Sequence, residues 1–209
     1  SILQYFFETL WLENYNIDAE QLEAALSERT RAIMIPHVLG IPCEMDAIMD
    51  FAEQHNLFVI EDACDALDSK YAGKPCGTFG TFGTYSFYAA HHIAMGEGGA
   101  LVTNNEELYK ITKSLRDWGR LSDYEDRFLN FEERFKHKIE DVEYDIRYLF
   151  VTLGYNLKPL DLQAAIGLEQ LKKLPQFTEA RKRNFEILHK ALSKYDELIM
   201  PQAPAKADP

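Results

Sequence analysis

The chain has 209 residues, of which 46% are hydrophobic and 27% charged, as is typical of a soluble globular domain and not of a disordered protein. Its formal net charge of -12 argues against non-specific binding to nucleic acid or anionic lipid, although a local pocket can still accept an anionic substrate. No apolar run approaches the roughly 20 residues that span a bilayer. The first residues lack the basic segment of a signal peptide, so we expect a cytoplasmic protein that binds neither nucleic acid nor membrane.

The cysteine content indicates a reducing compartment. Cys43, Cys64 and Cys76 are widely spaced and odd in number, which does not fit a disulfide framework. No C-x-x-C pair is present, so we expect no metal ion to be bound by this chain.

The first third of the chain alternates between helical and extended patterns. Asp18 and Gln21 have the spacing of a capping box before the first helix. Hydrophobic periodicity predicts helix, strand, helix and strand in turn, over residues 19–27, 32–35, 45–55 and 57–60. This alternation predicts an α/β fold with a mostly parallel sheet and covered faces.

The remaining elements are less regular. The chain contains a glycine-rich stretch over 73–83. Further on, residues 121–153 are highly charged and aromatic, and we expect them to form an excursion that lies outside the core. The pattern predicts two more strands and three more helices, over residues 84–88, 100–103, 106–118, 161–174 and 175–195. Asp161 is expected to cap the fourth helix, and the tail over 201–209 is expected to be loose.

Asp62 follows the predicted strand that ends at Ile60, where an open α/β sheet places its ligands. A carboxylate there can pair with a cationic ring nitrogen, as in a pyridoxal phosphate (PLP) enzyme, where the pairing keeps the pyridine protonated. A helix cap or a surface acid accounts for the same residue, and spacing alone favours these simpler interpretations.

His91 and His92 precede the turn Gly96-Glu97-Gly98-Gly99. On a strand, adjacent side chains point to opposite faces, so one of these imidazoles can face a pocket and act as a general base. Two structural histidines are the simpler alternative, and zinc is disfavoured because further ligands at usable spacing are missing. Ser86, at a strand end, can donate to a phosphate oxygen, although serines are common in such places.

Six ordered motifs together resemble the DegT/DnrJ sugar aminotransferase family, whose members have fold type I among PLP enzymes. The similarity extends from about Tyr15 to about Leu192. The motifs are, in chain order, EDACDA at 61–66, SFYAAH at 86–91, GEGG at 96–99, RDWGR at 116–120, GYNLK at 154–158 and DLQAA at 161–165.

The resemblance implies four contacts to the cofactor. Asp62 corresponds to the aspartate that pairs with the pyridine nitrogen, and Ser86 to a serine that binds the phosphate. Asn156 corresponds to an asparagine that reaches the phosphate from the partner subunit, which implies a homodimer. Asp65 occupies a position near the ring hydroxyl that is often glutamine or histidine.

The chain departs from the aminotransferases at His91, where they carry the lysine that forms a Schiff base. No lysine occurs between Lys74 and Lys110, so PLP or pyridoxamine phosphate is expected to bind non-covalently. The segment 91–99 resembles the 3-dehydratase branch, which acts on nucleotide-linked 4-keto-6-deoxy sugars. The branch implies that His91 is catalytic and removes a proton at the C4′ carbon of the aminated cofactor while the C3 hydroxyl of the sugar leaves.

One sub-branch of these dehydratases carries an iron–sulfur cluster. Cys64 corresponds to one cluster ligand, but no cysteine follows Arg120, where the other three are expected. Since a [2Fe–2S] centre needs four ligands, we predict a cluster-free enzyme similar to the dehydratase that leads to colitose, in lipopolysaccharide O-antigen biosynthesis. In that sub-branch an amino acid such as glutamate resupplies the amine. CDP-linked and GDP-linked substrates both remain open.

Two other functions remain open: a true nucleotide-sugar aminotransferase, and a catalytically silent homologue that acts as a binding subunit. Residues 1–174 are predicted to be part of the cofactor-binding large domain, and residues 175–209 a linker helix and the start of a small C-terminal domain. Relatives extend beyond both ends, so the resemblance implies a truncated chain with little activity and poor stability.

Overall fold

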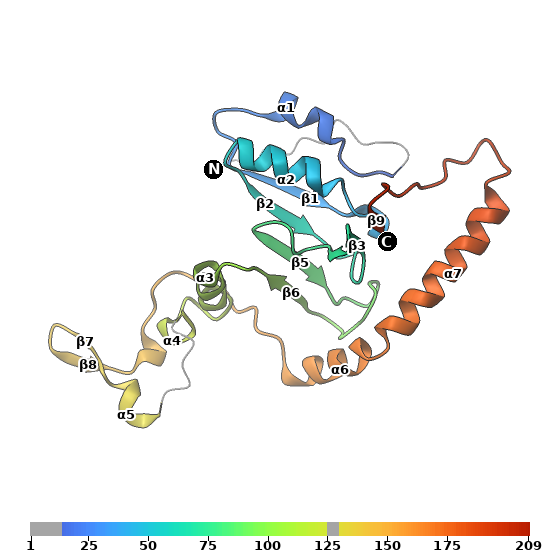
Figure 1. Ribbon diagram of the computed structural model, residues 1–209. Helices are drawn as coiled ribbons and strands as arrows, with labels where there is room; N and C mark the ends of the chain where they lie inside the picture. The colour runs from blue at the N-terminus through green and yellow to red at the C-terminus, as the bar shows by residue number, and fades with distance from the viewer. Residues whose placement is uncertain (1–13, 125–129) are drawn as a thin grey trace. The chain divides into compact units, whose positions relative to one another are not determined.

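The computed structural model describes residues 14–124 and 130–209 (Figure 1). They form two compact units, one made of residues up to 102 and from 161 onward, the other of residues 103–160. The predicted domain boundary after residue 174 falls at the start of a long helix inside the first unit and remains a prediction.

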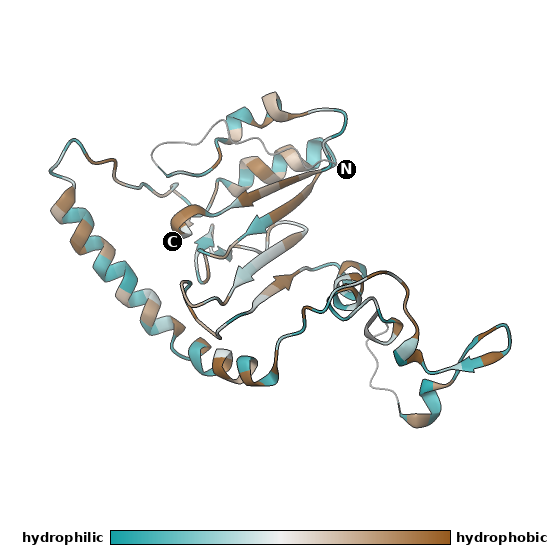
Figure 2. Ribbon diagram, turned by 180° about the vertical axis from the view of Figure 1, so that it is seen from behind, coloured by the Kyte–Doolittle hydropathy of each residue, from teal (hydrophilic) through white to brown (hydrophobic). Residues whose placement is uncertain are grey.

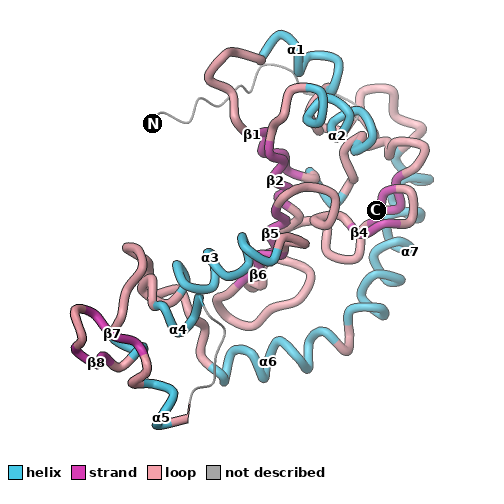
Figure 3. The backbone as a smooth tube through the Cα atoms, turned by 60° about the vertical axis from the view of Figure 1, so that its left-hand side comes forward, coloured by secondary structure: helices cyan, strands magenta, loops and turns pink. Residues whose placement is uncertain are grey.

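A sheet in the order β1-β2-β5-β6 forms the centre of the first unit, and Figure 3 shows these strands side by side. The strands are β1 (Ala32–Pro36), β2 (Phe58–Asp62), β5 (Phe82–Ser86) and β6 (Gly99–Val102). β1, β2 and β5 run parallel, and β6 runs antiparallel to β5. The predicted α/β class with a mostly parallel sheet is confirmed.

Helix α2 (Met45–Gln54) covers one face of the sheet. Most buried side chains of this core come from α2, β1 and β2, and Leu22, Cys43 and Tyr71 complete it; the six from α2 and the strands are Met45, Ile48, Ala52, Ile33, Ile35 and Val59. Figure 2 shows the corresponding pattern, with brown apolar residues along the strands and alternating colours on the helix. Each large apolar side chain that is removed from water contributes about 1.5–3 kcal/mol, so this cluster is the main source of stability in the unit.

The opposite face of β1 and β2 is open in the part of the chain that the structure describes. Met34 and Phe58 lie on it and are 55% and 59% exposed. The sequence pattern predicted covered faces, whereas within residues 14–124 and 130–209 these two side chains lack a covering element. Asp62 points to the same face as Phe58, because the two residues lie an even number of positions apart on β2 and side chains alternate along a strand.

The first predicted helix is shorter than its pattern. It consists of a 3-10 turn over Ala19–Gln21 followed by α1 (Leu22–Ala25), and it ends because Leu26 has an extended backbone. Asp18 does cap it, accepting a hydrogen bond from the N–H group of Glu20 at 3.0 Å.

The C-terminal part of the first unit contains α6 (Asp161–Leu171) and α7 (Leu174–Leu192). Asp161 is the first helical residue of α6 rather than the residue before it. Pro175 lies in the first turn of α7, where its missing N–H group costs no hydrogen bond, and the break between the two helices precedes it, at residues 172–173.

The tail is ordered, contrary to the sequence prediction. β9 (Ala207–Asp208) pairs with β3 (Lys70–Tyr71), which also pairs with β4 (Lys74–Pro75). An ion pair of Lys206 with Asp46 adds to the contact. The partners lie more than 130 positions apart in sequence, so no local pattern could have revealed the pairing.

The second unit consists of short elements. They are α3 (Glu106–Arg116), α4 (Leu121–Tyr124), α5 (Phe131–Arg134), the hairpin β7 (His137–Ile139) with β8 (Val142–Tyr144), and a 3-10 turn over Ile146–Tyr148. The charged stretch at 121–153 therefore contains local structure of its own. Among the described residues of both units, no helix is long and apolar enough to span a membrane.

Candidate active site

The residues with candidate chemistry gather at the carboxyl ends of the parallel strands. Asp62 is the last residue of β2 and Ser86 the last residue of β5. The strand register aligns Asp62 with Pro36 on one side and with Thr84 on the other. Because side chains alternate along a strand, Pro36, Asp62 and Ser86 all point to the face that α2 does not cover.

A cavity of about 390 Å³ opens at this edge, a volume suited to a small molecule. The residues that line it come from the segments after β1, β2 and β5, and they are Pro36, His37, Val38, Asp62, Cys64, Asp65, Ser86 and His91. Four of the five predicted site residues therefore meet at one cavity: Asp62, Asp65, Ser86 and His91.

Backbone contacts fix the position of Asp62. Its carbonyl oxygen accepts a hydrogen bond from the N–H group of His37 at 3.0 Å. Its Oδ1 atom accepts a second bond from the N–H group of Cys64 at 3.1 Å, which closes the turn after β2. The carboxylate is thereby held at the edge of the cavity before any ligand binds.

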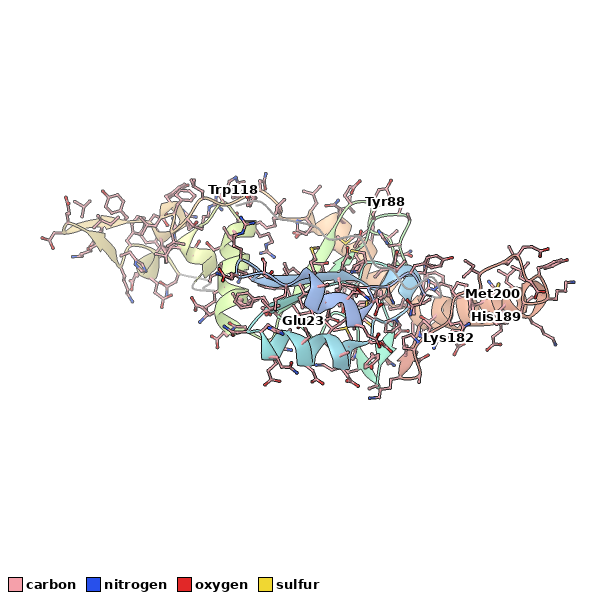
Figure 4. The ribbon with its side chains drawn as sticks, turned by 90° about the horizontal axis from the view of Figure 1, so that it is seen from above. Glu23, Tyr88, Trp118, Lys182, His189 and Met200 are labelled. Carbon is pink, nitrogen blue, oxygen red and sulfur yellow. The ribbon has the colours of Figure 1, made fainter. Side chains whose placement is uncertain are left out.

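His91 lies between the end of β5 and the start of β6. Figure 3 shows this connection as a loop. The backbone of Phe87 pairs with Gly98 and Met95, at 2.9 Å in both bonds, and the N–H group of His91 donates to the carbonyl oxygen of Tyr88 at 3.0 Å. Tyr88, labelled in Figure 4, is half exposed at the start of this loop. The two histidines therefore lie in a turn and not on a strand. The expectation that they point to opposite faces of a strand was wrong.

The predicted glycine turn does adopt the left-handed backbone that favours glycine, with φ of 90° at Gly96 and 147° at Gly98. This turn returns the chain to β6. His92 lies half-buried, and its Nδ1 atom has no hydrogen-bond partner among the described residues. Burial and the nearby Arg181 guanidinium lower the pKa of His92, so its ring is held neutral.

His91 and Asp65 form a direct pair across the cavity. The Nδ1 atom of His91 lies 3.1 Å from the Oδ1 atom of Asp65. The imidazole is 24% exposed and the carboxylate 56% exposed, so both groups remain accessible to a ligand. The sequence did not predict this contact, because a pairing between two loops has no local signature.

A buried network behind the cavity also escaped the sequence analysis. Glu61 is fully buried on the α2 side of the sheet, and its carboxylate accepts bonds at 2.7 Å from the N–H groups of Gly77, Phe79 and Gly80. The Nε2 atom of His37 contacts the same carboxylate at 3.1 Å. An acid at the end of an apolar strand was the available signal, since such a group needs several partners when buried.

The environment shifts the protonation of two groups near the cavity. Burial alone would raise the pKa of Glu61, but the bonds from His37 and from the backbone at Gly80 and Gly77 outweigh it and lower the pKa. Burial and the adjacent Asp62 carboxylate raise the pKa of the Cys64 thiol to about 12. Glu61 is therefore an anion at neutral pH, and Cys64 is a thiol and not a thiolate.

The fifth predicted site residue, Asn156, lies exposed in the second unit. It forms a bridge with Asp117, and the N–H group of Trp118 (Figure 4) donates to the carbonyl oxygen of Tyr155 at 2.9 Å. A Cβ atom at Gly119 would come within 2.0 Å of a backbone oxygen, so glycine is required there. The RDWGR and GYNLK motifs are thus two sides of one packed structure.

The fold is thus an α/β fold with a cavity at the carboxyl edge of its parallel strands. The model of the DegT/DnrJ/EryC1/StrS aminotransferase family matches residues 10–208, and the chain belongs to this family. The resemblance inferred from the six motifs is confirmed.

Relatives in this family include named 3-dehydratases. The chain is 45% identical to dTDP-4-dehydro-2,6-dideoxy-D-glucose 3-dehydratase of Saccharopolyspora spinosa, over 97% of this chain and 45% of that protein. It is 46% identical to lipopolysaccharide biosynthesis protein RfbH of Salmonella typhimurium, over 95% and 46%. The structure of E. coli GDP-4-keto-6-deoxy-D-mannose-3-dehydratase with bound hydrated PLP matches with a TM-score of 0.79 at 34% identity, over 94% and 49%. The chain therefore spans about half the length of these relatives.

Proposed function

We propose that the full-length protein removes the C3 hydroxyl of a nucleotide-linked 4-keto-6-deoxy sugar, with PLP or pyridoxamine phosphate bound non-covalently. The observation that carries this proposal is that His91 lines the cavity. By the family resemblance, the aminotransferases carry their Schiff-base lysine at this position of the sequence. No lysine is among the described residues that line the cavity, so nothing there favours the aminotransferase alternative.

The lining residues fit this cofactor by their chemistry. Asp62 offers a carboxylate to a protonated ring nitrogen, and Ser86 offers a hydroxyl to a phosphate oxygen. When bound, the cofactor supplies an electron-accepting ring and an amino group that reacts with a ketone. The role of Asp62 would be to keep the ring nitrogen protonated, and that of His91 to take up and return a proton.

The rest of the assignment follows from the family. Asn156 of a second subunit would contact the phosphate in a homodimer, and an amino acid such as glutamate would resupply the amine. The relatives act, by their names, on dTDP-linked and GDP-linked sugars, so the nucleotide is a matter for experiment. We further propose a cytoplasmic enzyme of polysaccharide biosynthesis without an iron–sulfur cluster, since no cysteine follows Arg120, where the family resemblance expects three further cluster ligands besides Cys64.

The direct test is the mass of the product. The full-length protein is incubated with PLP, glutamate and a 4-keto-6-deoxyhexose linked to dTDP, CDP or GDP. Replacement of the C3 hydroxyl by hydrogen, which is a net loss of one oxygen atom from the sugar, together with conversion of glutamate to 2-oxoglutarate and ammonia, supports the proposal. Gain of an amine at the C4 ketone with the C3 hydroxyl retained would identify an aminotransferase instead, and a protein with neither cofactor absorbance nor turnover would be a silent binding subunit.

Replacing His91 by asparagine tests the catalytic assignment. Asparagine has similar polarity but no basic nitrogen, so we predict that H91N loses dehydration by at least about 100-fold, the contribution of a general base. The affinity for PLP should change by less than about threefold, because the cofactor contacts at Asp62 and Ser86 remain. Substantial turnover by H91N would refute the role of this residue.

A further inference from the structure

The pair of His91 and Asp65 has a defined chemical consequence. An ionised carboxylate only accepts hydrogen bonds, so the Nδ1 atom of His91, at 3.1 Å from Oδ1 of Asp65, must carry the hydrogen. A neutral imidazole has one N–H group and one lone pair. The Nε2 atom therefore carries the lone pair, and it forms no hydrogen bond within the described residues.

A neighbouring histidine, His37, is held in the opposite tautomer. The Nδ1 atom of His37 accepts a bond from the N–H group of Cys43 at 3.1 Å. Its Nε2 atom, at 3.1 Å from Glu61, must therefore carry the hydrogen. His37 lines the cavity as well, but both of its nitrogens are used in the structure. Of these two imidazoles, His91 is the one with an available lone pair.

We propose that Asp65 is the positioning residue of the catalytic base, holding His91 in the Nδ1–H form so that Nε2 takes up the proton. The part of this inference that concerns catalysis rests on the proposed function. The part that concerns the tautomer stands on the contact alone. In this proposal Asp65 positions His91 and does not make the contact to the ring hydroxyl that the family resemblance implies.

The tautomer can be measured without cofactor or turnover. Long-range proton–nitrogen NMR spectra of the histidine-labelled full-length protein distinguish the two forms, and the H91N spectrum assigns the signals of His91. We expect an Nδ1–H form at His91 and an Nε2–H form at His37. In D65N the amide group can donate to Nδ1, so the His91 signals should shift toward the Nε2–H form. An Nε2–H form in the wild type, or unchanged signals in D65N, would overturn the inference.

A matched control comes from an exposed pair. His55 and Glu23 lie 3.4 Å apart on the surface, with Glu23 73% exposed. E23Q should leave the signals of His91 and His37 unchanged, and it should leave turnover unchanged. A shift at His91 in E23Q would show that the effect is not specific to Asp65.

Kinetics separate positioning from cofactor binding. We expect D65N to lower kcat by about 100-fold, because the base presents the wrong nitrogen, with the Kd for PLP changed less than about threefold. D65E retains a carboxylate and should recover both the Nδ1–H form and part of kcat. A weakened PLP affinity with an intact kcat would make Asp65 a ring ligand and refute the proposal. Failure of the proposed function would instead show as no dehydration by the wild type, and the NMR result would still decide the tautomer.

Discussion

Ser86 shows how a single residue can be prepared for a ligand. It is the last residue of β5, and its Oγ atom accepts a hydrogen bond from the N–H group of Tyr88 at 3.3 Å. Because the hydroxyl accepts in this contact, its own hydrogen is available to donate toward the cavity. The turn after β5 thus orients a donor at the place where the family resemblance expects a phosphate.

We predict that S86A weakens PLP binding by the full-length protein about tenfold, since a hydrogen bond to a charged group is worth about 1.5–3 kcal/mol and a tenfold change corresponds to the lower end. The measurement is a titration of cofactor absorbance. S193A is a suitable control, because Ser193 follows α7 and, within the described residues, its hydroxyl bonds to His189 alone. Equal affinities of S86A and wild type would rule out the phosphate contact.

At the scale of elements, the glycine-rich loop is fixed to the sheet through one carboxylate. Glu61 binds backbone N–H groups on this loop and the ring of His37 after β1, so one side chain joins three chain segments. Gly80 packs so closely on β2 that a Cβ atom would lie 2.5 Å from the carbonyl oxygen of Val59. These contacts hold the end of β2 in place, and with it the adjacent residue Asp62.

We predict that E61Q loosens this loop. Glutamine keeps the shape but cannot accept from all four donors, and each buried donor left unsatisfied costs about 1–3 kcal/mol. Hydrogen exchange of the Gly77 and Gly80 amides should therefore become about 100-fold faster or more. E23Q, in an exposed pair, should show no change, since such pairs contribute little.

The pH dependence of the loop follows from the lowered pKa of Glu61. A carboxyl group whose pKa is lower in the folded state stabilises that state above its ordinary value of 4.5, and the contribution is lost as pH falls through the lowered pKa. Amide protection at Gly77 should thus decrease below about pH 4.5 in the wild type. Protection in E61Q should be flat over this range; a parallel decrease in both proteins would contradict the role of Glu61.

At the scale of the whole molecule, the chain leaves apolar surface uncovered. None of the residues of α6 is buried, and Leu162 and Leu168 are 71% and 63% exposed. The open face of β1 and β2 adds Met34 and Phe58. This many exposed large apolar side chains agrees with a chain that spans about half the length of its relatives.

The proposed dimer has a composite site, which subunit mixing can test. H91N removes the base from the site of the subunit that carries it. N156D places a negative charge near the phosphate in the site of the partner subunit, which should repel the cofactor. Each variant alone should be inactive. After joint refolding, half of the dimers are mixed and each has one intact site, so about a quarter of wild-type activity should return. No recovery would indicate that Asn156 acts within its own subunit.

The sequence by itself determined the class of fold, the family and the residues with candidate chemistry. Hydrophobic periodicity located β1, α2 and β2 to within two residues, because burial against a sheet imposes a pattern that is local along the chain. The family resemblance assigned roles to Asp62 and Ser86, whereas the pattern placed the two strand ends at residues 60 and 88, each two residues away from the observed ends at Asp62 and Ser86. The order of the six motifs identified the family.

Only the tertiary structure decided which of these groups meet. The contact of His91 with Asp65, the bonds of Glu61 to the glycine loop and the pairing of β9 with β3 all join segments that are distant in sequence. Such contacts depend on how loops fold back over the sheet, and hydrogen bonding between distant loops leaves no periodic trace in the sequence. The choice of tautomer at His91 is therefore a property of the folded protein.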